Sequence, residues 1–141
     1  MTFLQHLHSG WAYLVLLILV LATFNALIKF FGDKEFGAMD FRISLFALIT
    51  MHIQLLIGII LWVSKGYFDE MSMGDIMKNS AVRQLVVEHP ITMIIAVALV
   101  TIGYSKHKKK LVSKPKFKIL SIFYTIALAL VLYMIPWNQW F

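Results

Sequence analysis

The sequence predicts an all-α fold: an integral membrane antiparallel four-helix bundle built as a single domain over residues 1–141. Hydrophobic residues make up 60% of the chain and charged residues only 14%, whereas a soluble domain is about half apolar and about a quarter charged. The apolar residues also gather in four stretches, and each can supply the roughly 20 residues that a helix needs to cross a bilayer. The lipid bilayer is therefore the first expected partner.

We expect membrane-spanning helices at about residues 8–30, 42–63, 81–105 and 117–136. No basic residue precedes the first apolar stretch, so this stretch is interpreted as an uncleaved span and not as a secretory signal. The third span contains Pro90, which frees the carbonyl four residues earlier and predicts a kink. Short connections after the first and third spans favour an up-down-up-down order, in which these two spans are diagonal neighbours.

The basic residues indicate how the spans are oriented. Ten of the thirteen lysines and arginines lie in two segments, 29–42 and 106–118, and the other three lie between the second and third spans. By the positive-inside rule, both segments are cytoplasmic and both termini lie outside. Segment 106–118 has no aromatic platform for bases, so we expect no nucleic-acid partner and instead contact with anionic lipid. Aromatic residues at the expected outer ends are interpreted as interface anchors: Trp11, Tyr13, Tyr133, Trp137 and Trp140.

Cysteine is absent, so histidine is the main strong metal ligand available. At about 1.5 Å per helical residue from the cytoplasmic ends, His8 lies at a depth of ~31 Å and His89 at ~25 Å. These depths differ by about one helical turn, and the two residues belong to diagonal helices. Imidazoles placed in this way match the bis-His ligation of a b-type haem. His52, at ~15 Å, is a poorer partner by this measure; it remains an alternative to His8 or a hydrogen-bonding residue of the bundle.

Three further residues leave alternatives open. His6 competes with His8 for the ligand role, but residues two apart on a helix face different directions, and His8 belongs more clearly to the span. Arg83 is either a partner of the haem propionates or an ordinary solvated charge. His107 lies among lysines and is interpreted as a loop residue.

A metal site on the outer face is a separate alternative. Two sets of residues have suitable ligand chemistry there. A divalent ion would use His6, His8, Glu88 and His89, and Cu(I) would use the softer Met71, Met73 and Met77.

Three short motifs resemble one four-helix half of haem A synthase, and also small bacterial four-span proteins with cytochrome-b-type names. They are His6-Leu7-His8-Ser9-Gly10 in the first span, Gln54-Leu55-Leu56-Ile57-Gly58 in the second and Glu88-His89-Pro90 in the third. The resemblance implies that His8 and His89 are the haem-iron ligands and that Gln54 and Gly58 mark the helix between them. It also implies a multi-pass protein of the bacterial inner membrane.

The sequence thus predicts a haem b-binding membrane protein that transfers electrons, with a quinone or a larger respiratory membrane complex as partner. We expect an electron carrier or a subunit and not a free-standing enzyme, so no catalytic residue is assigned. The expected cofactor-binding residues are His8, His89, His52 and Arg83. The alternative is a cofactor-free structural or accessory subunit of a larger membrane complex, in which the histidines are hydrogen-bonding residues.

Overall fold

The computed structural model describes residues 2–137, which are helical throughout apart from short connections. The two N-terminal helices are α1 (Phe3–Phe31) and α2 (Ala38–Ser64). Short segments follow: α3 (Tyr67–Glu70), α4 (Met73–Lys78), α5 (Ser80–Arg83) and a π-helical segment, η1 (Gln84–Glu88). The last two long helices are α6 (His89–Lys108) and α7 (Ser113–Met134).

Four helical stretches are long and apolar enough to cross a membrane: Phe3–Phe31, Ala38–Glu70, Ser80–Lys108 and Ser113–Met134. The first three contain the predicted spans, and the fourth ends two residues before the predicted boundary at 136. Their outward faces carry large exposed apolar side chains, among them Leu17, Phe46, Ile94 and Ile122. Such faces fit an apolar surrounding medium, because lipid tails accept apolar side chains without a solvation cost.

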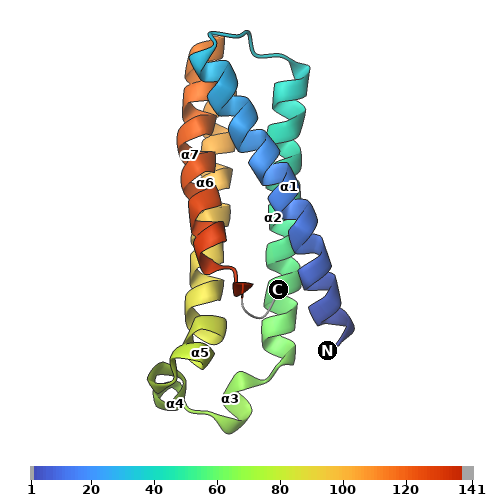
Figure 1. Cartoon of the computed structure of the whole chain (residues 1–141), viewed down its shortest axis with the longest axis vertical. Helices are drawn as coiled ribbons and strands as arrows, with labels where there is room; N and C mark the ends of the chain where they lie inside the picture. Colours follow the sequence, from blue (N-terminus) through green and yellow to red (C-terminus); the bar gives the residue numbers. More distant parts are fainter. Residues whose placement is uncertain (1, 138–141) are drawn as a thin grey trace.

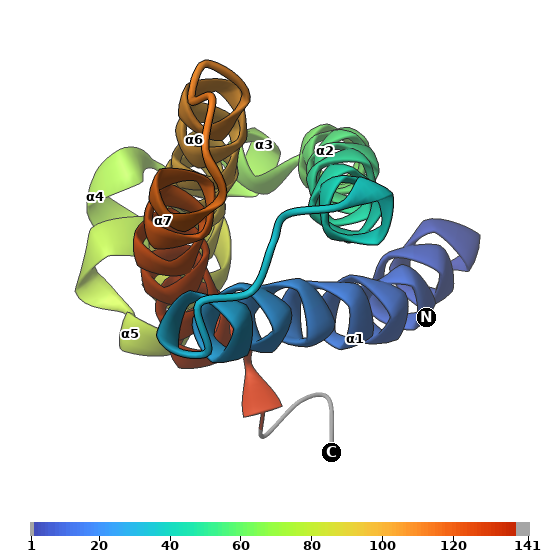
Figure 2. The same ribbon diagram turned by 90° about the horizontal axis from the view of Figure 1, so that it is seen from above.

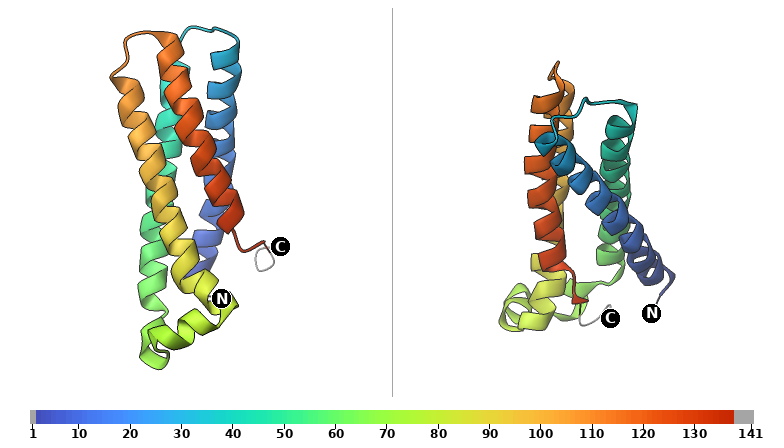
Figure 3. Two further views of the ribbon diagram at one scale, coloured as in Figure 1. Left: turned by 90° about the vertical axis from the view of Figure 1, so that its left-hand side faces the viewer. Right: turned by 45° about the horizontal axis from the view of Figure 1, so that its top comes forward.

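The long helices run alternately up and down in Figure 1, and they pack in a closed order in which α1 contacts α2, α2 contacts α6, α6 contacts α7 and α7 contacts α1. α1 and α6 are therefore diagonal to each other. Figure 2 shows that α1 lies obliquely in the bundle, and that the C-terminal end of α1 is the part close to α7. The α1–α2 and α6–α7 connections lie at the same end of the molecule, which we call the basic end (Figure 3). The short helices lie at the opposite end, which we call the α3–α5 end.

The core runs along the axis between the four long helices. Small residues allow close helix approach; a Cβ atom at Gly103 of α6 would lie 2.5 Å from the Cβ atom of Phe123 of α7. Tyr124 of α7 is fully buried, and its hydroxyl donates to the Ser44 carbonyl of α2 at 2.8 Å. This hydrogen bond joins the diagonal helices α2 and α7.

Pro90 lies in the first turn of α6, directly after η1. Proline lacks an N–H, so the carbonyl of Val86 loses its helical donor. The indole Nε1 of Trp62 on α2 donates to this carbonyl at 2.9 Å. The irregularity expected at Pro90 is thus a π-helical segment before it, and a neighbouring helix satisfies the freed carbonyl.

The aromatic residues expected as interface anchors differ in their surroundings. Trp11 is not a simple surface anchor, because its Nε1 donates to the Thr50 carbonyl of α2 at 2.9 Å and its side chain packs against the core. Tyr13, Tyr133 and Trp137 have exposed side chains. Trp140 lies outside the described residues.

Candidate functional site

The candidate site is a pair of imidazoles near the α3–α5 end, which we call the histidine pair: His8 of α1 and His89 at the start of α6. Their ring centroids are 6.3 Å apart and their ring planes meet at 79°. Both side chains are partly buried. The proximity expected from counting helical rise is therefore present, and the pair bridges two helices that are diagonal in the bundle.

The ring of His89 is oriented by the end of α7. Its Nδ1 is hydrogen-bonded to the Met134 carbonyl at 3.0 Å. A carbonyl only accepts, so Nδ1 carries the proton and Nε2 keeps its lone pair. Met134 is the last residue of α7, where carbonyls lack intrahelical donors. Metal-ligating histidines commonly donate their other N–H to a backbone carbonyl in this way.

The His8 ring is accommodated by α2. Gln54 Nε2 donates to the His8 carbonyl at 2.8 Å. One turn further along α2, a Cβ atom at Gly58 would lie 3.1 Å from His8 Cε1, so this glycine leaves room for the imidazole. His8 Nδ1 and Gln54 Oε1 are buried, and neither has a hydrogen-bond partner among the described residues. Because buried polar atoms are normally paired, both atoms have capacity for a bound group.

The spacing of the histidine pair fits one metal ion between the rings. A ligating imidazole nitrogen lies about 2 Å from its metal and about 1 Å from its own ring centroid, so two opposed ligand rings have centroids about 6 Å apart. The observed separation is 6.3 Å. Two rings can share one ligation axis at any angle about that axis, so the 79° between the planes is compatible with it.

His52 is hydrogen-bonded elsewhere. Its Nδ1 bonds to the Leu48 carbonyl at 2.8 Å, and its Nε2 lies 3.4 Å from the Thr101 hydroxyl of α6. Its side chain is exposed. The structure does not bring His52 to Gln54, whose amide bonds to His8 instead.

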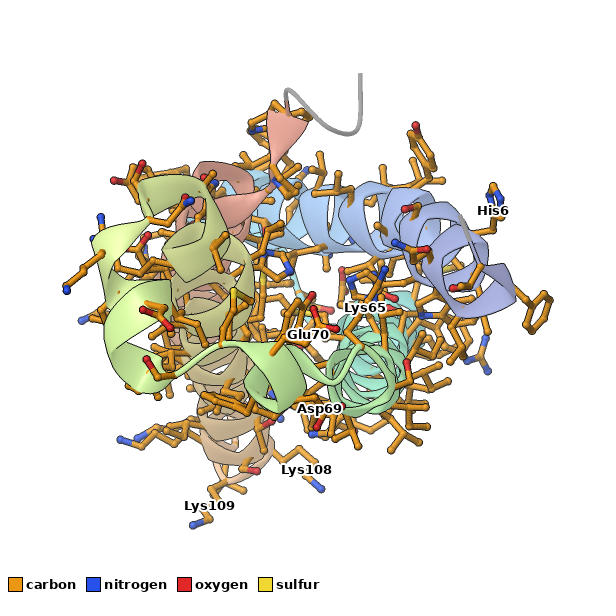
Figure 4. The ribbon with its side chains drawn as sticks, turned by 90° about the horizontal axis from the view of Figure 1, so that it is seen from below. His6, Lys65, Asp69, Glu70, Lys108 and Lys109 are labelled. Carbon is orange, nitrogen blue, oxygen red and sulfur yellow. The ribbon has the colours of Figure 1, made fainter. Side chains whose placement is uncertain are left out.

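Arg83 and His6 do not join the pair. Arg83 Nη1 donates to the Met77 carbonyl at 2.9 Å, and its Nε lies 3.5 Å from Glu88 Oε2. The residue expected as a propionate partner or a solvated charge is thus paired with the residue that precedes His89. His6 is exposed and points away from the bundle (Figure 4), which separates it from His8 although both lie on α1.

The alternative divalent-ion site is not assembled among the described residues. Within residues 2–137, no three His, Cys, Asp or Glu side chains are grouped so that they could hold a metal ion. The set of His6, His8, Glu88 and His89 therefore does not form a site. Met73 and Met77 are exposed.

His107 is placed differently from its interpretation as a loop residue. It lies within α6 and is 0% exposed. The rings of Phe36, Phe41 and Tyr104 surround it at centroid distances of 5.5, 6.1 and 5.0 Å. Its Nδ1 donates to the Tyr104 carbonyl. Only Tyr104 is close to His107 in the sequence, and the other two rings come from the connection after α1 and the start of α2, so the lysine-rich segment itself carried little signal of burial.

Sequence reasoning also missed Asp40, which is 2% exposed at the start of α2. Its carboxylate accepts hydrogen bonds from Asn25 at 2.9 Å, Lys29 at 2.6 Å and the Gly37 N–H at 2.8 Å. These contacts tie α1 to α2 at the basic end. All of them are internal to the protein, so we assign Asp40 a structural role.

No protein-family model matches this chain, and comparisons with curated proteins and with solved structures also find no match.

Proposed function

We propose that this chain is a haem b-binding integral membrane protein that transfers electrons, and that His8 and His89 would hold the haem iron. One observation carries the proposal: the ring centroids of the two imidazoles lie 6.3 Å apart across the bundle, and His89 Nδ1 donates its hydrogen bond to the Met134 carbonyl, which leaves the Nε2 lone pair for a metal. When bound, haem supplies one-electron chemistry between its ferric and ferrous states.

The neighbouring residues hold the two ligands in place. Met134 fixes the ring orientation of His89, and a donor bond of this kind also raises ligand basicity. Gln54 holds the backbone of α1 at His8, and Gly58 leaves space for the ring. Gln54 and Gly58 belong to the motif that resembles haem A synthase, so their contacts with His8 support the same assignment.

We also propose that the four apolar helices cross the bacterial inner membrane with the basic end in the cytoplasm. Ten of thirteen basic residues lie at or beside that end, which favours this orientation. The histidine pair then lies near the outer face, where a bound haem would exchange electrons with a quinone or a larger respiratory complex.

The orientation can be tested because the chain has no cysteine. A single cysteine introduced as Asp69→Cys, in α3, is expected to react with an impermeant maleimide in intact cells. Lys109→Cys, at the basic end, is expected to react only after the membrane is opened. The opposite labelling pattern would reverse the orientation, and labelling of both in intact cells would contradict membrane insertion.

Haem binding is tested by the reduced-minus-oxidised absorption spectrum of protein produced with ample haem and purified in detergent. The expected spectrum has a Soret peak and a narrow α-band of bis-His haem. His8→Ala and His89→Ala are each expected to abolish it. His6→Ala is the matched control, because His6 lies on the same helix and points outward, and it is expected to retain the spectrum.

Two results would contradict the proposal at different points. A folded but colourless preparation excludes haem binding and favours the cofactor-free accessory subunit. Loss of haem in His52→Ala, with retention in His8→Ala, shows that the ligand assignment is wrong.

A further inference from the structure

A groove lies between the C-terminal part of α1 and the N-terminal part of α7, at the basic end. Its volume is about 390 Å³, which is within the range of small-molecule sites. Most of its lining is apolar. The lining residues are Leu27, Phe30 and Phe31 of α1 and Lys118, Ser121, Ile122, Thr125 and Ile126 of α7.

The mouth of this groove is positively charged. Lys118 is exposed, and no carboxylate among residues 2–137 forms an ion pair with it. Lys114, one turn earlier, is already paired with Asp33 at 2.8 Å and lies over the Phe30 ring. Segment 106–118 contains seven lysines and no acidic residue. An anionic group is therefore favoured at Lys118.

Ser121 lies in the wall of the groove, with its hydroxyl buried below the surface. It lines the groove and is only 6% exposed, and its hydroxyl has no hydrogen-bond partner among the described residues. A serine within a helix often donates to the carbonyl three or four residues earlier, and this one does not.

The polar and apolar parts of the groove are ordered along the helix axis. Lys118 is at one end, and Ile126 is eight residues further along α7, about 12 Å deeper. In the proposed membrane orientation, Lys118 lies at the level of the lipid phosphates of the cytoplasmic leaflet and Ile126 at the level of the acyl chains. A glycerophospholipid has this order of groups: phosphate, ester oxygens, acyl chain.

We propose that this groove binds one anionic glycerophospholipid of the cytoplasmic leaflet. Lys118 pairs with the phosphate, and an acyl chain packs along Phe31, Ile122 and Ile126. A second copy of the chain is disfavoured, because docking in the same orientation would bring two lysine-rich ends together. The inference rests on the proposed membrane insertion and is independent of haem binding.

The test is native mass spectrometry of detergent-solubilised protein titrated with phosphatidylglycerol or with phosphatidylcholine of the same acyl chains. The wild type is expected to retain one phosphatidylglycerol in preference. Lys118→Gln should weaken its binding about fivefold to tenfold, and Ile122→Trp should fill the groove and remove the bound lipid. Thr125→Trp is a second filling variant if Ile122→Trp misfolds. Lys109→Gln is the matched control, because Lys109 does not line the groove and projects on the side of the molecule away from α1 (Figure 4).

Several outcomes would overturn the inference. Equal losses in Lys109→Gln and Lys118→Gln indicate general charge attraction and not a site. Full competition by inorganic phosphate indicates an anion site without a lipid. A dimer that Ile122→Trp abolishes identifies a second copy as the occupant. The same spectra report bound haem by its mass, so failure of the lipid site and failure of the haem proposal are distinguishable.

Discussion

Two imidazoles on the same helix, α6, are held by the same local bond in different surroundings. In each, Nδ1 donates to a backbone carbonyl, that of Met134 for His89 and that of Tyr104 for His107. Opposite His89 lies the imidazole of His8, whereas His107 is enclosed by three aromatic rings. The bond from Nδ1 to a carbonyl therefore does not by itself mark a ligand. The group that faces the rest of the ring distinguishes a candidate site from a core residue.

The largest difference between the two histidines is expected when both receive the same substitution. We expect His89→Phe to abolish the bis-His haem spectrum, because phenylalanine has no nitrogen ligand. We expect His107→Phe to keep the spectrum and to change the free energy of unfolding by less than about 1.5 kcal/mol, because a phenyl ring fits an aromatic cluster with similar volume. Absorption spectra and thermal unfolding in detergent measure both effects. Loss of haem in His107→Phe alone would reverse the roles assigned to the two residues.

Substitutions at the two glycines that allow close approach are expected to have smaller effects. One should lower the stability of the fold, and the other should weaken haem retention. Gly103→Ala forces a Cβ atom to 2.5 Å from Phe123 Cβ, so we expect it to lower the free energy of unfolding by about 1–3 kcal/mol with the ligand geometry unchanged. Gly58→Ala places a Cβ atom 3.1 Å from His8 Cε1. It is expected to weaken haem retention about tenfold, which corresponds to about 1.4 kcal/mol. Haem titration of the two variants beside thermal unfolding checks this division, and equal haem loss in both variants would contradict it.

The smallest expected effect is at Gln54. Gln54→Leu removes the hydrogen bond to the His8 carbonyl, and a bond of this kind contributes about 1 kcal/mol. We expect haem to bind about fivefold more weakly, with both axial ligands retained in the reduced spectrum. Gln54→Glu is a useful companion, because it keeps the length of the side chain and loses the amide donor. Unchanged affinity in both variants would show that Gln54 does not position His8.

The spans and the proximity of His8 and His89 could be predicted because both depend on counting. Apolar runs report length, and a fixed rise per residue converts length into depth. The burial of His107 could not be predicted in this way. Lysines on both sides of it indicated a solvated loop, and its burial depends on Phe36, which approaches from a connection distant in the sequence.

The surroundings of Pro90 show the same limit. The sequence predicts that the Val86 carbonyl loses its helical donor, because proline has no N–H. It does not predict that Trp62, 24 residues earlier, supplies the replacement. Local chemistry thus shows that the Val86 carbonyl needs a new hydrogen-bond donor. Only the packing of α2 against the third apolar stretch shows that Trp62 supplies it.

The diagonal position of the histidine pair has a consequence for the lifetime of the protein. The chain consists of two hairpins, α1 with α2 and α6 with α7, and α1 and α6 make few direct contacts. A group held by both imidazoles would therefore clamp one hairpin to the other, in addition to the bond between Tyr124 and Ser44 on the other diagonal. A ligand that binds only the assembled state stabilises it in proportion to the logarithm of its concentration. The cellular supply of such a group would then control how much of the protein survives proteolysis, before it controls any electron transfer.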